Sequence, residues 1–212
     1  YTSYKNKKMI NKIYKRIHTR FANIYKFIFF LRYVFAIFFI SATLFVLIPK
    51  YFNYEKKIEI IKEYLIYHYQ LDLKDYGLIK FKVFPSPNLS ISNVNLKIEK
   101  KDINIKSTNM NIFLNFKNLY NYKDLKVKKI LLEDNDIYLD INKTKYLINY
   151  FKKLKNKIIM DNLNIKFIKE NKKLVEIKNM NFSNYGFKKK NFKGEIFGKF
   201  FHAALKDKNK VL

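Results

Sequence analysis

The residue types that most often carry chemistry are scarce and widely separated in this chain. Cysteine is absent, so a disulfide framework or a thiolate metal site is excluded. The three histidines, His18, His68 and His202, lie far apart in the sequence. His68 falls on the apolar stripe of a predicted helix, where a hydrogen-bonded core histidine is more common than a metal ligand. We therefore predict neither a metal nor a cofactor.

The remaining polar motifs do not form a catalytic signature. The acidic cluster 133–136 could bind a cation weakly, although a solvated loop is the more common meaning of such a cluster. Gly194 and Gly198 belong to an alternating run, 192–200, that predicts a strand rather than a phosphate-binding loop. The sequence has neither a nucleophile elbow nor a zinc-binding pair of histidines. These observations predict that the chain is not an enzyme.

The net charge of +27 raises the question of nucleic-acid binding. Arginine, which is favoured for reading base edges and clamping phosphates, occurs only at Arg16, Arg20 and Arg32. Lys, Asn, Ile, Tyr and Phe are abundant together, as the codons of an AT-rich genome would produce. Part of the charge therefore reflects composition on solvated surfaces, and we predict no nucleic-acid partner.

An apolar segment near the start of the chain is long enough to cross a membrane. Residues 27–48 read FIFFLRYVFAIFFISATLFVLI, and their single charge, Arg32, can extend to the interface. A helix of this length spans about 33 Å, close to the thickness of a hydrocarbon core, and Pro49 ends the segment. A cleaved signal peptide is the alternative, but its apolar core would be shorter and no small-x-small site follows Ile48. We favour an uncleaved transmembrane helix over 27–48.

The distribution of charge around this segment predicts its orientation. Nine Lys and Arg residues, counting Arg32, occur up to the end of the segment without a single acid, and the first acidic residue is Glu55. Basic residues tend to remain on the cytoplasmic side, so residues 1–26 are predicted to be a basic cytoplasmic segment that rests on anionic headgroups. Residues 50–212 are predicted to form a domain across the membrane.

The period of the apolar residues changes along this domain. Residues 55–70 have the spacing of an amphipathic helix, and 71–77 have the composition of a turn region. From Leu78 onward, apolar and polar residues alternate in repeated short runs, which is typical of strands with one apolar face. Residues 144–154 predict a short helix between strands. The fold class is therefore mainly β, a transmembrane helix followed by an antiparallel sheet with short helices.

The alternation changes phase at three places, and these changes predict a curved, groove-like sheet. At Asn93 and at Asn179 the apolar set moves by one residue, and residues 127–130 repeat the change without Asn. A β-bulge keeps the same face inward after such a change, and repeated bulges bend a sheet. The pattern also suggests an internal repeat of an extended β unit, with coincidence in a Lys-, Asn- and Ile-rich sequence as the alternative.

The predicted strands supply a longer apolar face than the helices 55–70 and 144–154 can cover. Such a face needs a second sheet, a partner or a ligand. Two hypotheses follow: an open groove that holds acyl chains, or a sheet that folds on itself as a sandwich. The candidate groove residues are Ile79, Phe81, Val83, Leu89, Ile91, Val94, Leu96, Met110, Ile112, Leu114, Ile130, Leu132, Ile137, Leu139, Ile165, Phe167, Ile177 and Met180.

Two runs in the sequence resemble the N-terminal region of AsmA-like envelope proteins. Residues 81–96 read FKVFPSPNLSISNVNL, which is similar to that family's apolar-x-x-Pro-x-Pro-x-Leu-x-Leu-x-x-Val-x-Leu run after its membrane anchor. Residues 125–139, LKVKKILLEDNDIYL, are similar to a second run, except that Asn135 stands where the family often has Pro. The resemblance covers about residues 27–185.

This resemblance implies an anchor in the bacterial inner membrane, a periplasmic curved β-groove, and a role in outer-membrane biogenesis and in moving lipids between membranes. Membrane lipids are the implied partners, together with other envelope proteins, and no catalytic residues are implied. Members of the family are longer than this chain, so we expect its C-terminus to be truncated. The alternative function is a non-catalytic structural or scaffold envelope protein whose sheet folds on itself.

Overall fold

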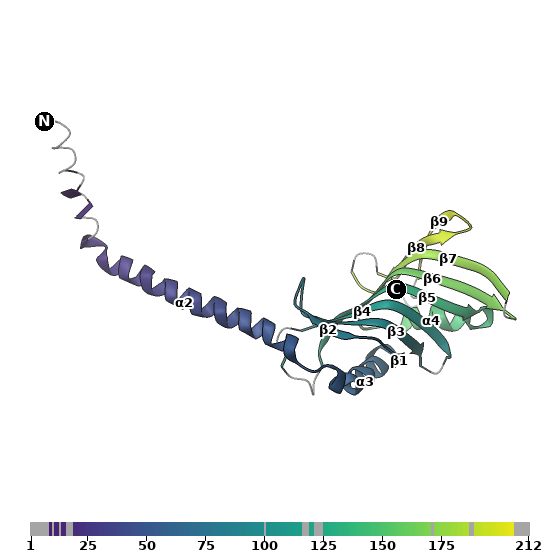
Figure 1. Cartoon of the computed structure of the whole chain (residues 1–212). Helices are drawn as coiled ribbons and strands as arrows, with labels where there is room; N and C mark the ends of the chain where they lie inside the picture. The colour runs from purple at the N-terminus through teal and green to yellow at the C-terminus, as the bar shows by residue number, and fades with distance from the viewer. Residues whose placement is uncertain are drawn as a thin grey trace, which may run out of the picture. The chain divides into compact units, whose positions relative to one another are not determined.

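Figure 1 shows the computed structural model of the chain, which divides into two compact units, Tyr1–Ile48 and Pro49–Leu212. The structure describes residues 9, 11–12, 14–15, 19–99, 101–115, 119–120, 125–170, 172–186 and 189–205, with only the backbone of Lys57. Half of the predicted basic segment 1–26, and the C-terminal residues 206–212, therefore lie outside the described part of the chain.

The first unit contains one long apolar helix, α2, Ala22–Leu47. A 3₁₀ turn, Ile48–Tyr51, continues it, and the combined helix is long and apolar enough to cross a membrane. None of the α2 residues is buried, and Phe29, for example, is 64% exposed. The core helix of a globular protein buries its apolar side chains, whereas this helix leaves them exposed. The predicted membrane segment 27–48 lies within it.

The second unit is built on one nine-stranded sheet, which is strongly curved and does not close into a barrel (Figure 1). The strand order is β1-β3-β4-β5-β6-β7-β8-β9, and β2 also pairs with β3. The strands are β1 Leu71–Asp75, β2 Ile79–Lys82, β3 Asn88–Ile98, β4 Ile103–Leu114, β5 Val127–Asp140, β6 Ile158–Lys169, β7 Lys172–Ser183, β8 Asn191–Ile196 and β9 Lys199–Ala204. The mainly β class and the curved sheet are confirmed.

Both helices predicted for this unit are present. They are α3, Ile58–Tyr69, and α4, Thr144–Lys153, each preceded by a short 3₁₀ turn, Glu55–Lys57 and Ile141–Lys143. Because α4 connects β5 to β6, the chain returns to the same end of the sheet, and β5 and β6 pair in parallel. The antiparallel prediction is confirmed for the other described strand pairs and is wrong for this one.

The prediction of a turn over 71–77 is wrong for the first five residues, which form β1. Leu71 and Leu73 are buried and lie opposite Ile98 and Leu96 of β3. The series Leu-Asp-Leu-Lys-Asp has the period of a strand, and an end strand tolerates Asp on its exposed face.

The run 192–200, predicted as a single strand, is instead a tight hairpin. β8 ends at Ile196 and β9 begins at Lys199, which lies opposite it. The two residues between them, Phe197 and Gly198, have φ of 51° and 72°, as a two-residue hairpin turn requires. Gly198 adopts a positive φ at little cost. The alternation of apolar residues continues through the turn, so the pattern alone did not indicate two strands.

Four residues with left-handed backbone mark a line that crosses the sheet. Asn93, Asp134, Asn162 and Asn179 have φ of 48°, 51°, 51° and 51°. Strand pairing places Asn93 opposite Thr108, Thr108 opposite Asp134, and Asp134 beside Asn162. Asn and Asp adopt this conformation more readily than other residues that carry a side chain. The strands therefore change phase at one level, and the same face of the sheet stays inward.

A β-bulge is confirmed at two of the three predicted places. The pairing of β4 with β5 shifts register between Phe113 and Leu114, opposite residues 127–129, and the pairing of β7 with β8 shifts around Asn179. At Asn93 the bulge prediction is wrong, because β3 and β4 keep one register along their whole length. No extra residue is needed there, since β4 changes phase at Thr108, directly opposite.

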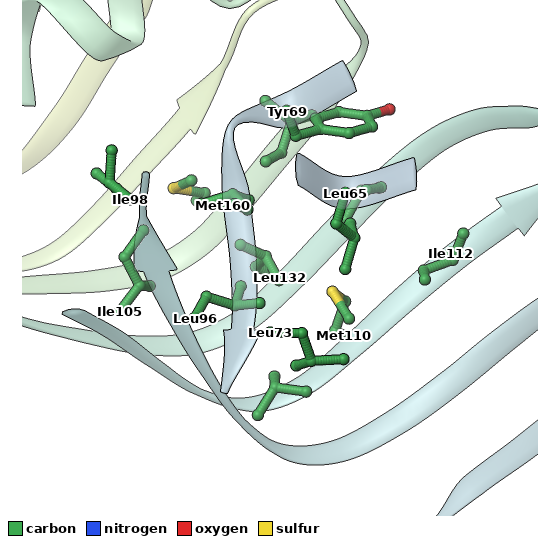
Figure 2. Close-up of a cluster of buried hydrophobic side chains, with 14 of the residues drawn as sticks. Leu65, Tyr69, Leu73, Leu96, Ile98, Ile105, Met110, Ile112, Leu132 and Met160 are labelled. Carbon is green, nitrogen blue, oxygen red and sulfur yellow. The ribbon is translucent and has the colours of Figure 1, made fainter. Parts of the chain in front are cut away.

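The inward face of the sheet packs against α3 and α4 in one hydrophobic core. Figure 2 shows side chains from α3 and from β1, β3, β4, β5 and β6 around a common centre, among them Leu65, Leu73, Leu132 and Met160. Leu65, Leu132 and Met160 are 0% exposed. Over this part of the inward face, side chains of α3 and α4 cover the apolar side chains of the sheet.

Candidate lipid-binding face

All the candidate groove residues belong to one apolar cluster or pack against it. Most of them, however, are buried inside it. The buried ones are Phe81, Leu89, Ile91, Val94, Leu96, Met110, Ile112, Leu114, Ile130, Leu132, Ile137, Leu139, Ile165 and Met180. Ile79, Val83, Phe167 and Ile177 are partly buried against the same cluster. The central part of the face is therefore a core rather than an open groove.

Side chains of the two helices account for this closure. α3 contributes Ile58, Ile61 and Leu65, and α4 contributes Leu147 and Phe151 to the same buried cluster. The ring of Phe151 lies 4.6 Å from that of Phe182 and 5.6 Å from that of Phe192, as aromatic pairs prefer. A single short helix thus covers inward residues of both β7 and β8.

The cover is incomplete where β6, β7, β8 and β9 meet. We call the five half-buried apolar residues on the inward face there the open end: Phe167, Val175, Ile177, Ile196 and Phe201. Pairing places Phe167 opposite Val175, and Ile177 opposite both Ile165 and Ile196. Sequence reasoning included only Phe167 and Ile177. The hairpin 191–204 supplies Ile196 and Phe201. Recognising Phe197 and Gly198 as a two-residue turn would have placed these two residues on the inward face.

The contact between Gly194 and Phe201 fixes the position of the aromatic ring at the open end. The two residues lie opposite each other in the β8–β9 pair. A Cβ added to Gly194 would lie 3.0 Å from Cε1 of Phe201 and 3.2 Å from Cβ of Met180. The absence of a side chain at Gly194 therefore lets the Phe201 ring pack onto the sheet.

Exposed apolar side chains adjoin the open end. Leu174, Phe197 and Phe200 are 48%, 79% and 90% exposed, and each is next in sequence to an open-end residue. β9 is the last strand of the sheet in the described part of the chain. Apolar side chains beside an end strand form a surface that can contact another apolar group.

The outward face of the sheet is polar across β4, β5 and β6. The side-chain amides of Asn109 and Asn111 donate to Oε2 of Glu133 at 2.8 and 3.2 Å. Asp161 lies beside Glu133 in the parallel pair. Burial, and then the charge of Glu133, raises the pKa of Asp161 above its usual value of 3.8. This face is solvated and hydrogen-bonded, and it is not suited to acyl chains.

The structure also places the acidic and histidine residues considered from the sequence. Glu133, Asp134 and Asp136 lie within β5, so their assignment to a loop is wrong. His68 is half-buried on α3 with its ring 4.2 Å from that of Tyr64, and His202 is exposed on β9. His18 is outside the described residues. Within the described part of the chain, no group of three or more His, Asp or Glu residues could hold a metal ion.

The chemistry of this domain is therefore that of a closed apolar core with one incompletely covered end. Comparison with known proteins adds no relative, since no protein-family model, curated protein or solved structure matches this chain.

Proposed function

We propose that this chain is a single-pass protein of a bacterial inner membrane whose periplasmic β domain binds lipid acyl chains at the open end. The helix Ala22–Tyr51 is the anchor, and its length and exposed apolar surface support that role. The orientation is supported by charge, because ten Lys and Arg residues occur before the first acid, Glu55.

The incomplete cover of the open end is the observation that carries this proposal. At the centre of the face, Ile91, Met110 and Ile130 are 0% exposed. At the open end, Phe167 and Ile177 are only half-buried. Removing such a surface from water is favourable, by about 0.8 kcal/mol for each methylene group of a ligand that is buried with it. An acyl chain supplies methylene groups in a linear series and needs no polar partner.

The resemblance to AsmA-like proteins supports placing this activity in outer-membrane biogenesis and lipid movement. It rests on the order of the anchor, the helix 58–69 and the runs 81–96 and 125–139. In the structure these runs form β2, β3 and β5, whose inward residues are core. Lipid contact in this proposal is therefore restricted to the open end and does not extend along the centre of the sheet.

A scaffold role is the second candidate, and the closed core favours it. Fourteen of the candidate groove residues are buried without any ligand, so the domain does not need a lipid in order to cover them. In that case the apolar side chains of Leu174, Phe197 and Phe200 would contact a protein instead of an acyl chain.

Photo-crosslinking in the membrane-inserted full chain separates these two functions. A benzophenone amino acid at Phe201 replaces one aromatic ring by another at the open end. We expect it to form adducts with phospholipids, detectable by mass spectrometry of the purified protein. The same amino acid at Phe151, which is 2% exposed on the buried side of α4, is the matched control and should give no lipid adduct.

The result at Phe201 decides between the proposals. Lipid adducts at Phe201 but not at Phe151 support acyl-chain binding. Protein adducts without lipid adducts at Phe201 would contradict it and favour the scaffold role. Phe200, which is 90% exposed and neighbours Phe201 on the opposite side of β9, reports contact with bulk membrane and corrects for it.

A further inference from the structure

A basic pocket of about 760 Å³ lies where the C-terminal ends of α3 and α4 meet the connection between β7 and β8. Its lining includes five lysines: Lys152, Lys153, Lys155, Lys189 and Lys190. We call these residues the lysine pocket. It shares no residue with the open end, so it is a separate feature of the domain.

The lysine pocket differs in charge from three other pockets of the domain. None of its lining residues is Asp or Glu. Three other pockets each combine lysine with carboxylates, among them Glu176, Asp136 and Asp102. The lysine pocket is therefore a localised concentration of positive charge.

Four of these lysines have no carboxylate partner among the described residues. Lys152, Lys153, Lys155 and Lys189 form no ion pair there, in contrast to Lys166, which lies 3.4 Å from Oδ1 of Asp136. An anion bound in the pocket would be attracted by each of these ammonium groups. A negatively charged ligand would therefore supply the counter-charge that these four lysines lack among the described residues.

Main-chain carbonyl groups at the two helix ends would normally oppose an anion. Here side chains occupy them. The Tyr150 hydroxyl donates to the carbonyl of Tyr69 at 3.0 Å, and the side-chain amide of Asn156 donates to that of His68 at 2.7 Å. The Asn184 amide donates to the carbonyl of Leu154 at 3.1 Å. With these acceptors satisfied, the lysine charges dominate the pocket.

The same hydrogen bonds make the walls of the pocket rigid. The Tyr69 hydroxyl donates to the carbonyl of Lys157 at 3.3 Å, which ties the end of α3 to the segment before β6. Asn184 is 4% exposed, and its Oδ1 accepts from the Ile158 amide at 2.9 Å. Burial raises the pKa of the Tyr69 and Tyr150 hydroxyls, so both stay protonated as donors. These bonds tie the two helix ends, Asn184 and the segment before β6 together beside the lysines.

We propose that the lysine pocket binds a phosphoryl group that carries at least two negative charges. Lysine is a point-charge donor suited to phosphate oxygens, and several lysines around one group give charge-assisted hydrogen bonds. The volume accommodates more than a single phosphate. A phospholipid headgroup and a free phosphorylated compound share this chemistry, and the experiment separates them.

The test uses the full chain in micelles of an uncharged detergent and measures binding by calorimetry. The pocket variant is Lys152→Gln/Lys155→Gln/Lys189→Gln. The control variant, Lys80→Gln/Lys106→Gln/Lys193→Gln, removes three exposed lysines from strands. It therefore has the same net charge as the pocket variant. With pyrophosphate as probe, we expect equal affinity for the original chain and the control, and at least about tenfold weaker binding for the pocket variant.

Short-chain lipids identify the source of the phosphoryl group. Dihexanoyl phosphatidic acid that binds and is displaced by pyrophosphate supports a headgroup site, whereas binding of pyrophosphate alone supports a free phosphorylated ligand. Dihexanoyl phosphatidylcholine, which has no net charge, should not bind in either case. Absence of binding by both anionic probes, or an equal loss of affinity in the pocket and control variants, overturns the proposal. These outcomes do not depend on lipid adducts at Phe201.

Discussion

The side-chain amide of Asn162 donates a 2.7 Å hydrogen bond to Oδ1 of Asp134, and both residues have left-handed backbone with φ of 51°. They occupy adjacent positions on the parallel strands β5 and β6. Next to them, the main-chain N–H of Asn162 donates to Oδ1 of Asn181 at 3.0 Å, and the main-chain N–H of Asn179 donates to Oδ1 of Asn164 at 3.1 Å. Side chains therefore replace ladder hydrogen bonds where the strands change phase.

Substitution of Asn162 tests this arrangement. Asn162→Gly removes the bond to Asp134 but tolerates φ of 51°, whereas Asn162→Ala removes the bond and adds left-handed strain of about 1 kcal/mol. We expect the alanine variant to be less stable than the glycine variant by about that amount, a difference of about 2–4 °C in Tm for a domain of this size.

The control for this comparison is Asn104, an exposed residue of β4 outside the left-handed set. At an ordinary strand position glycine is less stable than alanine, so the order of the two variants should be the opposite at Asn104. Thermal unfolding followed by far-UV circular dichroism measures both series. The same order at both positions would contradict the assigned role of Asn162.

The line of phase changes shows where sequence reasoning succeeds and where it fails. Asn93 and Asn179 could be predicted because apolar residues flank them on both sides. Asp134 could not, because the inward position after it is taken by Asn135, which is 0% exposed. Its amide donates to the carbonyls of Leu132 and Asp161 at 3.0 and 2.8 Å. A buried polar residue with its donors satisfied breaks the apolar alternation without breaking the strand.

The membership of the apolar face was predictable from period, but its cover was not. Alternation reports which side chains share a face, and it grouped Ile91, Ile112 and Ile130 correctly. Whether a helix closes over that face depends on the direction in which α3 and α4 cross the sheet, which no local pattern encodes. The parallel β5–β6 pair was missed for the same reason, since it depends on the path of the connection through α4.

A charge at the centre of the face should have a different effect from a charge at the open end. Ile130 is 0% exposed, and Ile130→Asp places a carboxylate in the core, which opposes folding by several kcal/mol. Ile177→Asp lies at the open end, where the carboxylate can reach water, so we expect the domain to remain folded with a loss of about 1–2 kcal/mol. Thermal unfolding of the full chain in detergent measures both variants.

The conservative variants Ile130→Val and Ile177→Val separate charge from volume. Ile130→Val should destabilise by about 1 kcal/mol through the lost methyl group, and Ile177→Val should have a smaller effect. Equal stability losses for the two aspartate variants would show that the open end is as well covered as the centre, and it would remove the basis for acyl-chain binding there.

The stability of the domain should depend on the ionisation of Asp161. Its pKa is higher in the folded chain than in the unfolded chain, so the ionised carboxylate opposes folding above the folded-state pKa. The contribution of this group to stability therefore improves as pH falls through that pKa toward 3.8. We expect Asp161→Asn to raise Tm at pH 7, and the difference from the original chain to narrow toward pH 4.

Asp102 provides a control with the opposite sign. Hydrogen bonds from Lys97 and Lys143 lower the pKa of Asp102, so its ionised form favours folding and that contribution is lost as pH falls. Asp102→Asn should therefore lower Tm slightly at pH 7 and have no effect at low pH. A lower Tm for Asp161→Asn at pH 7 would show that its carboxylate is a favourable contact of the outward face.

The orientation of the chain can be tested with single cysteines, because the sequence has none of its own. The position beyond the anchor must be exposed. Lys193 is exposed on β8, and a cysteine there should react freely, while a cysteine at Ser3 reports the N-terminal side of the anchor.

In intact spheroplasts of a Gram-negative host, a membrane-impermeant maleimide should label Lys193→Cys and leave Ser3→Cys unlabelled. After lysis both should be labelled, which shows that each thiol is reactive. This outcome follows from the energy of moving charge across the membrane, since Lys and Arg near the anchor hold the N-terminal side in the cytoplasm. Labelling of Ser3→Cys alone in spheroplasts would reverse the orientation. It would place the open end and the lysine pocket in the cytoplasm, and the periplasmic role would have to be abandoned.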